Sequence, residues 1–120
     1  MEKAWDGSGW YTGDLNFANS VVRAALGVTS WGDGNSLGIR VYYGAPGNVI
    51  KEKGWDGWGG SARWYDGAFS QACLPASNVC TIPLPVLRVY LQSGINNTAV
   101  TEFAWTGAGW SVGRPALPPA

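Results

Sequence analysis

One short motif, a glutamate followed by a tryptophan three residues later and a glycine two residues after that, occurs three times in the chain. Its residues recur at a constant interval: Glu2, Glu52 and Glu102; Trp5, Trp55 and Trp105; Gly7, Gly57 and Gly107. A second tryptophan follows each copy: Trp10, Trp64 and Trp110. Self-similarity with a period of about 20–50 residues indicates a repeat architecture. We therefore expect the chain to fold as stacked copies of one small unit.

The composition favours short strands joined by tight turns. The 120 residues include 18 Gly, 8 Trp and 5 Tyr, but only 1 Met. Aromatic residues favour strands and glycine favours turns. Eight tryptophans are also more than a core of this size needs. We predict an all-β protein.

Charge and hydropathy argue against several classes of partner. Eight Lys and Arg balance eight Asp and Glu, so no basic face is available to hold a phosphate backbone, and we expect no nucleic acid partner. No apolar run approaches the length of a membrane span, and we expect no membrane insertion. Met1-Glu2-Lys3 does not resemble a secretory signal. A cytosolic protein and one that is released and acts at cell surfaces both remain open.

The cysteine and histidine content limits the chemistry. Histidine is absent and only Cys73 and Cys80 are present, which excludes a His-based triad and a His/Cys zinc cluster. We expect no metal and no other cofactor. The cysteine spacing allows a small disulfide loop or two unreactive buried thiols, and the lack of a leader favours the thiols.

Turn signals and alternating apolar residues divide the chain into hairpins. Residues 1–15 are predicted to form a hairpin around an Asp-Gly turn. A four-stranded unit is predicted over 21–69, with strands at 21–31 (buried), 37–43, 49–55 and 64–69. A second unit is predicted over 78–113, with strands at 79–84, 87–92, 99–105 and 110–113, followed by a Pro-rich tail at 114–120.

Four-stranded units of this length are typical of β-propeller blades. We predict about two and a half blades of antiparallel strands in a single domain over residues 1–120. An isolated blade leaves open edges and buries little surface. Either copies of the chain complete a ring by oligomerisation, or the chain is part of a longer propeller.

Each predicted blade places an arginine beside a glutamate. A hairpin that folds about Pro46 puts Arg40 opposite Glu52, and Arg88 and Glu102 are likewise equidistant from Ile95. Side chains opposed in this way lie about 5 Å apart. A single surface ion pair of this kind is worth under about 1 kcal/mol and needs no function. Its recurrence beside the tryptophan motif favours a binding site.

These residue types match a sugar. The arginine fork donates hydrogen bonds and the carboxylate accepts them, as vicinal hydroxyls require, and an indole face suits the C–H side of a sugar ring. We therefore predict monosaccharide sites that include Trp55 and Trp64. Trp31 is expected to pack in the core or between blades.

Two alternatives come from other functional classes. A glycosidase needs two carboxylates within about 5–10 Å. Each unit offers one glutamate beside an arginine that would keep it ionised, and Asp6 and Asp56 are explained by their turns, with Thr106 in the third copy. We therefore expect no catalysis. The other alternative is a structural module whose tryptophans only hold the blades together.

With these residues placed, the chain resembles the fucose-binding propeller lectins of the Aleuria aurantia lectin family. That family includes six-bladed fungal members and short two-blade bacterial members that trimerise. The matching run is IRVYY…IKEKGWDG…WYDGAF, echoed by LRVYLQ…VTEFAWTGAGWSVG and by the opening EKAWDGSGWYTG. The closing GRPALPPA resembles the C-terminus of fungal members. The resemblance covers nearly the whole chain.

The resemblance implies a site between adjacent blades, with L-fucose or fucosylated oligosaccharides and glycoproteins as ligands. Arg40 and Glu52 would bind the hydroxyls and the ring oxygen, assisted by the backbone near Ala68. Trp105 and Trp110 of the following blade would stack on the sugar.

The resemblance also implies an apolar contact and a second site. Leu37 and Ile39 would line the pocket for the C6 methyl group, which distinguishes fucose from galactose. Arg88 and Glu102 would form the second site with tryptophans of a neighbouring subunit: either Trp55 and Trp64, or Trp5 and Trp10. A homo-oligomer is implied, with a trimer preferred over a five-blade dimer.

The chain departs from the family pattern in three places. An insertion at 58–63 lengthens the turn before Trp64 and could displace it. Residues 78–86 lack the usual Ala-rich, Trp-ended inner strand, which puts the second site in doubt. Hairpin 1–15 lacks the first two strands of its blade.

Overall fold

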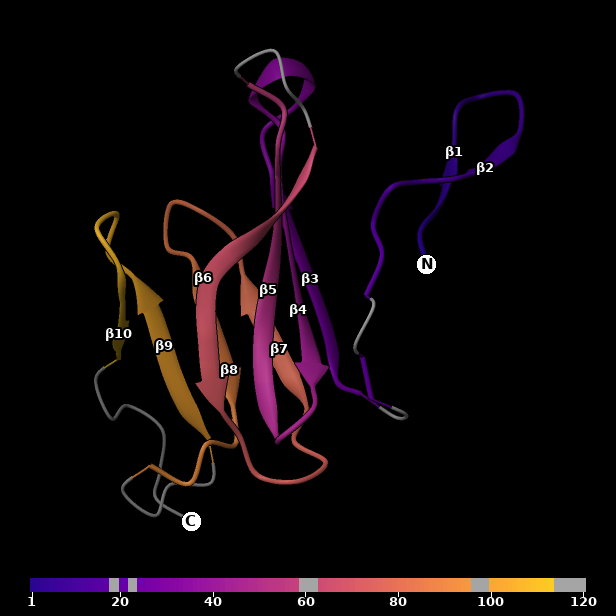
Figure 1. Cartoon of the computed structure of the whole chain (residues 1–120). Helices are drawn as coiled ribbons and strands as arrows, with labels where there is room; N and C mark the ends of the chain where they lie inside the picture. Colours follow the sequence, from indigo (N-terminus) through magenta and orange to yellow (C-terminus); the bar gives the residue numbers. More distant parts are fainter. Residues whose placement is uncertain (18–19, 22–23, 59–62, 96–99, 114–120) are drawn as a thin grey trace.

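The computed structural model describes residues 1–17, 20–21, 24–58, 63–95 and 100–113, and these fold almost entirely into antiparallel strands (Figure 1). The described strands form a two-stranded hairpin followed by two four-stranded sheets. Two blades and a half-blade were predicted, and this all-β arrangement is confirmed. Among the described residues, no helix is both long and apolar enough to cross a membrane.

The N-terminal hairpin closes on an Asp-Gly turn, as predicted. Asp6 Oδ1 accepts hydrogen bonds from the backbone N–H groups of Ser8 and Gly9, each at 2.8 Å. These bonds lower the pKa of Asp6. The hairpin strands are β1 (Lys3–Trp5) and β2 (Trp10–Thr12).

The first blade follows the chain order β3-β4-β5-β6, with a short 3₁₀ helix between β3 and β4. Its elements are β3 (Leu26–Trp31), η1 (Gly34–Ser36), β4 (Gly38–Ala45), β5 (Val49–Asp56) and β6 (Trp64–Ala72).

The prediction of a buried strand over 21–31 is wrong for β3, which begins at Leu26 and is buried on one face only. Leu26 and Val28 are 62% and 57% exposed, whereas Gly27 and Thr29 are buried. Successive side chains of a strand point to opposite faces. One row of β3 therefore faces β7 of the second blade, where Gly27 lies against Val79, and the other row faces away.

The second blade has the order β7-β8-β9-β10. Pro83 and Pro85 come after the end of β7, so neither proline interrupts the hydrogen-bond ladder of that strand. The predicted tail at 114–120 and the first residue of the strand expected at 99–105 lie outside the described residues. The strands are β7 (Val79–Ile82), β8 (Arg88–Leu91), β9 (Thr101–Trp105) and β10 (Trp110–Val112).

The predicted pairing of arginine with glutamate is wrong by two residues. Arg40 lies opposite Gly54, and Glu52 lies opposite Tyr42. The hairpin closes around Gly47 rather than Pro46, because the positive φ of 83° suits glycine whereas proline suits the preceding turn position. A shift of two residues keeps side chains on the same face, so the arginine and the glutamate become diagonal neighbours.

The second blade shows the same shift. Arg88 lies opposite Ala104, and Glu102 lies opposite Tyr90. In both blades a tyrosine, rather than the arginine, is therefore the direct cross-strand partner of the glutamate.

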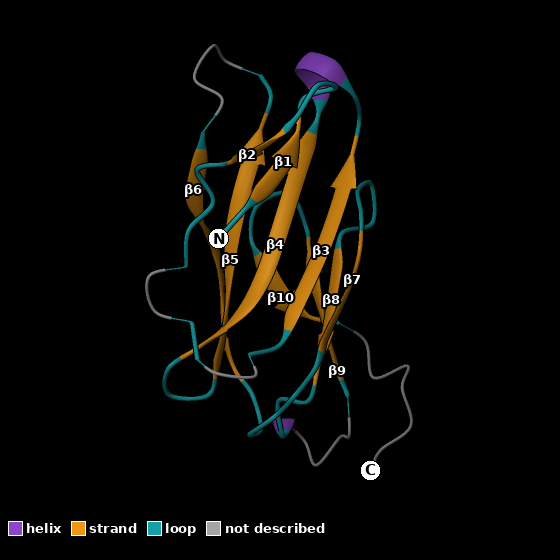
Figure 2. Ribbon diagram, turned by 90° about the vertical axis from the view of Figure 1, so that its right-hand side faces the viewer, coloured by secondary structure: helices purple, strands orange, loops and turns teal. Residues whose placement is uncertain are grey.

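The two blades pack face to face, as both views show (Figures 1 and 2). Phe69 lies at the centre of the contact, with its ring centroid 5.4 Å from Tyr42 and 5.5 Å from Phe103 in edge-to-face geometry. Such pairs contribute about 0.5–1.5 kcal/mol beyond the area that they bury. The buried residues of this core are Tyr42, Ile50 and Phe69 of the first blade and Val89, Leu91 and Phe103 of the second.

Both cysteines are free thiols, as expected, but the expectation that both are buried is wrong. Cys73 is half-buried and Cys80 is exposed. Burial raises the pKa of the Cys73 thiol. The described residues contain no group of three His, Cys, Asp or Glu side chains that could hold a metal ion.

Candidate functional site

A pocket of about 350 Å³ lies between the two blades, and we call it the interblade pocket. It brings together five residues named from the sequence, three from the first blade and two from the second: Arg40, Glu52, Ala68, Trp105 and Trp110. The two indole rings come from β9 and β10, which pair at Trp105 and Trp110.

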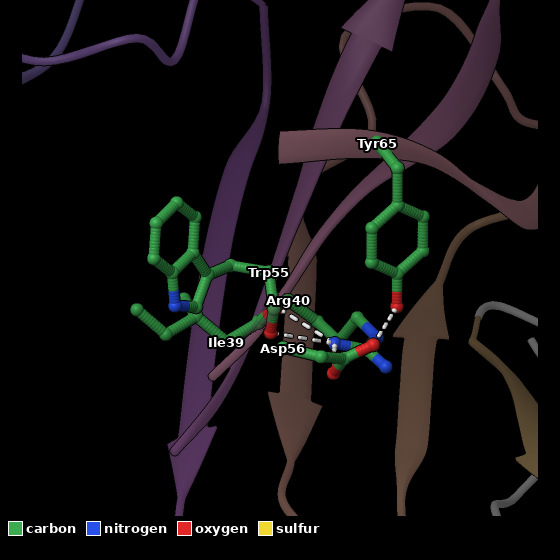
Figure 3. A network of polar contacts seen from close by, with 5 residues as sticks. All are labelled: Ile39, Arg40, Trp55, Asp56 and Tyr65. Atoms are coloured by element: carbon green, nitrogen blue, oxygen red, sulfur yellow. Dashed lines mark hydrogen bonds and ion pairs between the residues drawn. The ribbon is translucent and has the colours of Figure 1, made fainter. Parts of the chain in front are cut away.

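The Arg40 guanidinium is fixed by acceptors around one nitrogen (Figure 3). Nη1 donates to the carbonyl oxygens of Ile39 at 2.9 Å and Trp55 at 3.2 Å, and to Asp56 Oδ1 at 2.9 Å. Asp56 was expected to serve only its turn. That interpretation is wrong, because Asp56 ends β5 and forms a partly buried ion pair with Arg40.

Two aromatic rings enclose the same guanidinium. Its central carbon lies 4.9 Å from the ring centroid of Trp31 and 5.4 Å from that of Tyr65. Tyr65 also donates its hydroxyl to Asp56 Oδ2 at 2.6 Å. Burial and this hydrogen bond raise the pKa of Tyr65. Trp31 was expected to pack in the core or between blades, but it lines the interblade pocket beside Arg40.

Glu52 is the buried acceptor of the pocket, with 5% of its surface exposed. Among the described residues neither its Oε2 nor the facing Tyr42 hydroxyl has a hydrogen-bond partner of good geometry. Burial raises the pKa of Glu52 more than the nearby Tyr42 and Arg40 lower it. The expectation that Arg40 keeps Glu52 ionised is therefore wrong, because the effect of burial is larger than that of the Arg40 charge. Arg40 forms its ion pair with Asp56 instead.

The side chain of each repeated glutamate lies against a glycine at the outer strand of its sheet. This contact was not predicted from the sequence. A Cβ atom on Gly67 of β6 would collide with the Glu52 carboxylate. Gly13 and Gly113 have the same relation to the glutamates of the other two copies. The signal was present in the repeat, since each of these glycines follows the second tryptophan by three residues.

Leu37 and Ile39 do not line the interblade pocket, so their predicted place is wrong. They line a separate hollow of about 290 Å³ on the opposite face of the first blade, which we call the hairpin pocket. Adjacent strand residues point to opposite faces, so Ile39 and Arg40 cannot serve the same pocket. Leu84 and Leu87 of the second blade supply the apolar wall of the interblade pocket.

The hairpin pocket repeats part of the arrangement with the N-terminal hairpin in place of a full blade. It is lined by Glu2 together with Trp55 and Trp64. Glu2 Oε2 accepts hydrogen bonds from Trp64 Nε1 at 3.2 Å and from the backbone N–H of Leu15 at 3.1 Å. The carboxylate of this pocket is therefore already partnered.

Residues 1–120 match the family model described as fungal fucose-specific lectin. The chain belongs to this family. A fucose-specific lectin of Arthroderma benhamiae is 34% identical over 127 residues, which cover 100% of this chain and 34% of the relative. The chain spans about two fifths or less of the length of the curated relatives that it matches.

Solved structures of fucose lectins share the fold of this family member. SapL1 lectin, in a structure with alpha methyl fucoside, is 57% identical with a TM-score of 0.86 over 98% of this chain and 39% of its own. A lectin of Aleuria aurantia, described as a six-bladed β-propeller with a novel fucose recognition mode, is 30% identical with a TM-score of 0.69 over 92% of this chain and 33% of its own. The chain is thus part of a propeller.

The remaining predicted site residues of this fucose-lectin family member form two incomplete sets. Arg88 Nε lies 3.7 Å from Glu102 Oε1, while Glu102 Oε2 accepts the Tyr90 hydroxyl at 2.8 Å. Trp5 and Trp10 pair at 5.7 Å and are 54% and 71% exposed. One set thus has the polar groups and the other has the aromatic rings.

All three tryptophan pairs have the same geometry despite the insertion at 58–63. The ring centroids of Trp55 and Trp64 are 5.9 Å apart, and those of Trp105 and Trp110 are 5.6 Å apart. The interplanar angles are 55° and 59°. Trp64 is therefore not displaced by the longer turn.

Proposed function

We propose that this chain binds L-fucose and fucosylated glycans in the interblade pocket, without catalysis. One observation carries the proposal: a fixed guanidinium, a buried carboxylate with an unpartnered oxygen and two indole rings line one cavity. The alpha methyl fucoside in the SapL1 structure supports a fucoside as the ligand.

Each group has a role that follows from its chemistry. Arg40 donates to sugar oxygens and Glu52 accepts from hydroxyls, which together match a vicinal diol. Trp105 and Trp110 offer flat apolar surfaces to the C–H face of the ring. Leu84 and Leu87 supply the apolar wall for the methyl group of fucose.

The arrangement of carboxylates argues for binding rather than hydrolysis. A glycosidase requires two carboxyl groups placed about the scissile bond, one acting as acid and the other as base or nucleophile. Asp56 is occupied by Arg40 and Tyr65. Asp66 also lines the pocket, but its side chain is 80% exposed and forms an ion pair with Lys53 at 2.6 Å. Glu52 is then the buried carboxylate that the pocket offers to a ligand.

The direct test is a calorimetric titration with methyl α-L-fucoside. Arg40→Ala removes the donor fork and should weaken binding by about 1–3 kcal/mol. Arg63→Ala, at an exposed arginine outside the pocket, is the matched control and should change nothing. Absence of binding heat in the unmodified protein, or turnover of a nitrophenyl fucoside, would refute the proposal.

A purely structural module is the second candidate, because Trp110 also contacts the core. Its ring centroid lies 4.8 Å from that of Phe69. In that case free fucoside would leave the melting temperature unchanged, whereas a ligand that binds only the native state raises it. A rise with millimolar methyl α-L-fucoside would exclude this candidate.

We also infer that the chain acts in a multivalent assembly of copies, with a trimer ranked first. The Arg88–Glu102 set lacks tryptophans, and the Trp5–Trp10 pair lacks an arginine and a glutamate. Sets that complement each other in this way support head-to-tail association of identical chains.

A further inference from the structure

The guanidinium of Arg40 is held by groups other than Glu52, and Figure 3 shows two of them, Asp56 and Tyr65. Asp56 accepts a hydrogen bond from Nη1, and the central carbon lies 4.9 Å from the ring centroid of Trp31 and 5.4 Å from that of Tyr65. Tyr65 in turn holds Asp56 through its hydroxyl. We call Trp31, Asp56 and Tyr65 the arginine clamp.

The arginine clamp leaves several N–H donors of Arg40 free to bind a ligand. A guanidinium carries five N–H donors. Within the part of the chain that the structure describes, Nη1 makes the hydrogen bonds of Arg40, and Nε and Nη2 have no acceptor. Glu52 Oε2 has no hydrogen-bond partner of good geometry there, although Tyr42 lies directly across from Glu52. The donors of Arg40 and the carboxylate of Glu52 therefore remain separate from each other in one pocket.

The second blade shows what happens without the clamp. By the repeat, Thr106 stands at the position of Asp56 and Ser111 at that of Tyr65. The strand registers place Leu84 at the position of Trp31, two residues beyond the partner of the arginine. Thr106 donates its hydroxyl to Gly109 in its own turn.

The arginine of the second blade has a different ion-pair partner. Arg88 Nε approaches Glu102 to 3.7 Å, and the other oxygen of Glu102 accepts the Tyr90 hydroxyl. An arginine and a glutamate that are already partnered must exchange those contacts for contacts with a sugar. Groups held in the binding geometry avoid this cost.

We propose that Trp31, Asp56 and Tyr65 are positioning residues that hold Arg40 away from Glu52 and make the interblade pocket a tighter fucose site than the one built on Arg88 and Glu102. The inference rests on the proposed function of the same pocket. None of the three needs to touch the sugar for this effect, and Asp56 does not line the pocket.

The test measures methyl α-L-fucoside affinity in the Arg88→Ala background, which silences the second site. Asp56→Asn keeps the shape and removes the charge, and it should weaken binding about tenfold or more, as expected for a charged hydrogen bond. Tyr65→Phe keeps the ring and should cost less, about threefold. Asp6→Asn is the matched control: it makes the same change at the equivalent repeat position, where the carboxylate serves its own turn, and should leave affinity unchanged.

Two double-mutant cycles separate positioning from general structural damage. Lysine has no planar fork to orient. In the Arg40→Lys background, Asp56→Asn should therefore reduce the fucoside affinity much less than it does when Arg40 is present. Likewise, Tyr65→Phe should reduce the fucoside affinity no further once Asp56→Asn is present. Ligand-observed NMR extends both measurements to millimolar affinities, and thermal melts confirm that each variant is folded.

The outcomes are distinct. The inference would be overturned if Asp56→Asn reduced the fucoside affinity equally with Arg40 and with Arg40→Lys. It would also be overturned if the folded Asp56→Asn variant bound the fucoside with unchanged affinity. If Asp56→Asn does not fold, the Tyr65→Phe loss and its absence in the Arg40→Lys background decide the matter in the same way. A parent protein that does not bind methyl α-L-fucoside would instead overturn the proposed function.

Discussion

Glu52 combines burial with a task that requires charge. In the proposed function its carboxyl accepts hydrogen bonds from a sugar, yet burial raises its pKa above the ordinary value of 4.5 and so favours the neutral form. Residues selected for function often carry such a cost in stability. The two requirements give opposite pH dependences, and these can be measured.

We predict that methyl α-L-fucoside affinity falls as the pH is lowered through the raised pKa of Glu52, because the protonated carboxyl is a poorer acceptor. Stability should change in the other direction. The native state holds this proton more tightly than the unfolded state, so the contribution of Glu52 is fully present below 4.5 and is lost as the pH rises through the raised pKa. Calorimetry and thermal melts between about pH 4 and 8 test both trends.

Glu52→Gln is the control for this prediction. The amide does not titrate, so both pH dependences should be reduced, while the melting temperature at neutral pH rises and fucoside binding weakens. An affinity that stays constant across the pH range in the unmodified protein would contradict the assignment of Glu52 as the ionised acceptor.

At the scale of the strand pair, β6 is shaped to receive a side chain from β5. Gly67 leaves the space that the Glu52 carboxylate occupies. The colliding atoms belong to the flexible end of a side chain, so a methyl group there should displace the carboxylate rather than disrupt the sheet. The glycine thus belongs to the site although it offers a ligand no polar side chain.

We predict that Gly67→Ala weakens methyl α-L-fucoside binding by about 1–3 kcal/mol, the usual cost of losing a buried hydrogen-bond partner. The melting temperature should change little. Gly9→Ala is the control, since a Cβ atom there meets nothing within 4 Å. Affinity retained in folded Gly67→Ala would show that the carboxylate position is not limiting.

The sequence predicted the strands better than their register. Repeated Asp-Gly and tryptophan motifs located the hairpins, and alternation gave the face of each residue. The position of Pro46 was misread as the centre of its turn, because the need for a positive φ at Gly47 is not visible in the residue pattern alone. The same limit hid the arginine clamp, whose members meet only once β3, β4, β5 and β6 are aligned.

The apolar wall was missed for a related reason. Leu37 and Ile39 precede Arg40 in sequence and were assigned to its pocket, yet the pocket takes Leu84 and Leu87 from the following blade. A site between two blades draws its equivalent residues from different copies of the repeat. Proximity in sequence to one site residue is therefore a poor guide to the rest.

At the scale of the whole molecule, the chain carries one complete set of the proposed site residues and two partial sets that complement each other, besides the glutamate and tryptophan pair of the hairpin pocket. Copies joined so that Trp5 and Trp10 of one meet Arg88 and Glu102 of the next would complete a further site at each junction. Several weak sites on one assembly bind a glycan-coated surface far more tightly than one site does.

We predict a trimer by light scattering in native buffer, with more fucoside bound per chain than the single interblade pocket accounts for. Arg88→Ala should lower that stoichiometry without changing the affinity of the interblade pocket, which it does not line. A monomer at micromolar concentration with unchanged affinity would exclude this assembly. The chain would then be a section of a larger propeller.

The edge-to-face contact of Trp110 with Phe69 joins the pocket to the interior of the molecule. Arg40 and Glu52 belong to one blade, while Trp105 and Trp110 belong to the other. A sugar held by all four is therefore a noncovalent cross-link between two sheets that are otherwise joined by side-chain packing and one connecting segment. The blades cannot separate while the sugar contacts all four residues, so the lifetime of the complex sets a lower bound on how long the two blades stay together.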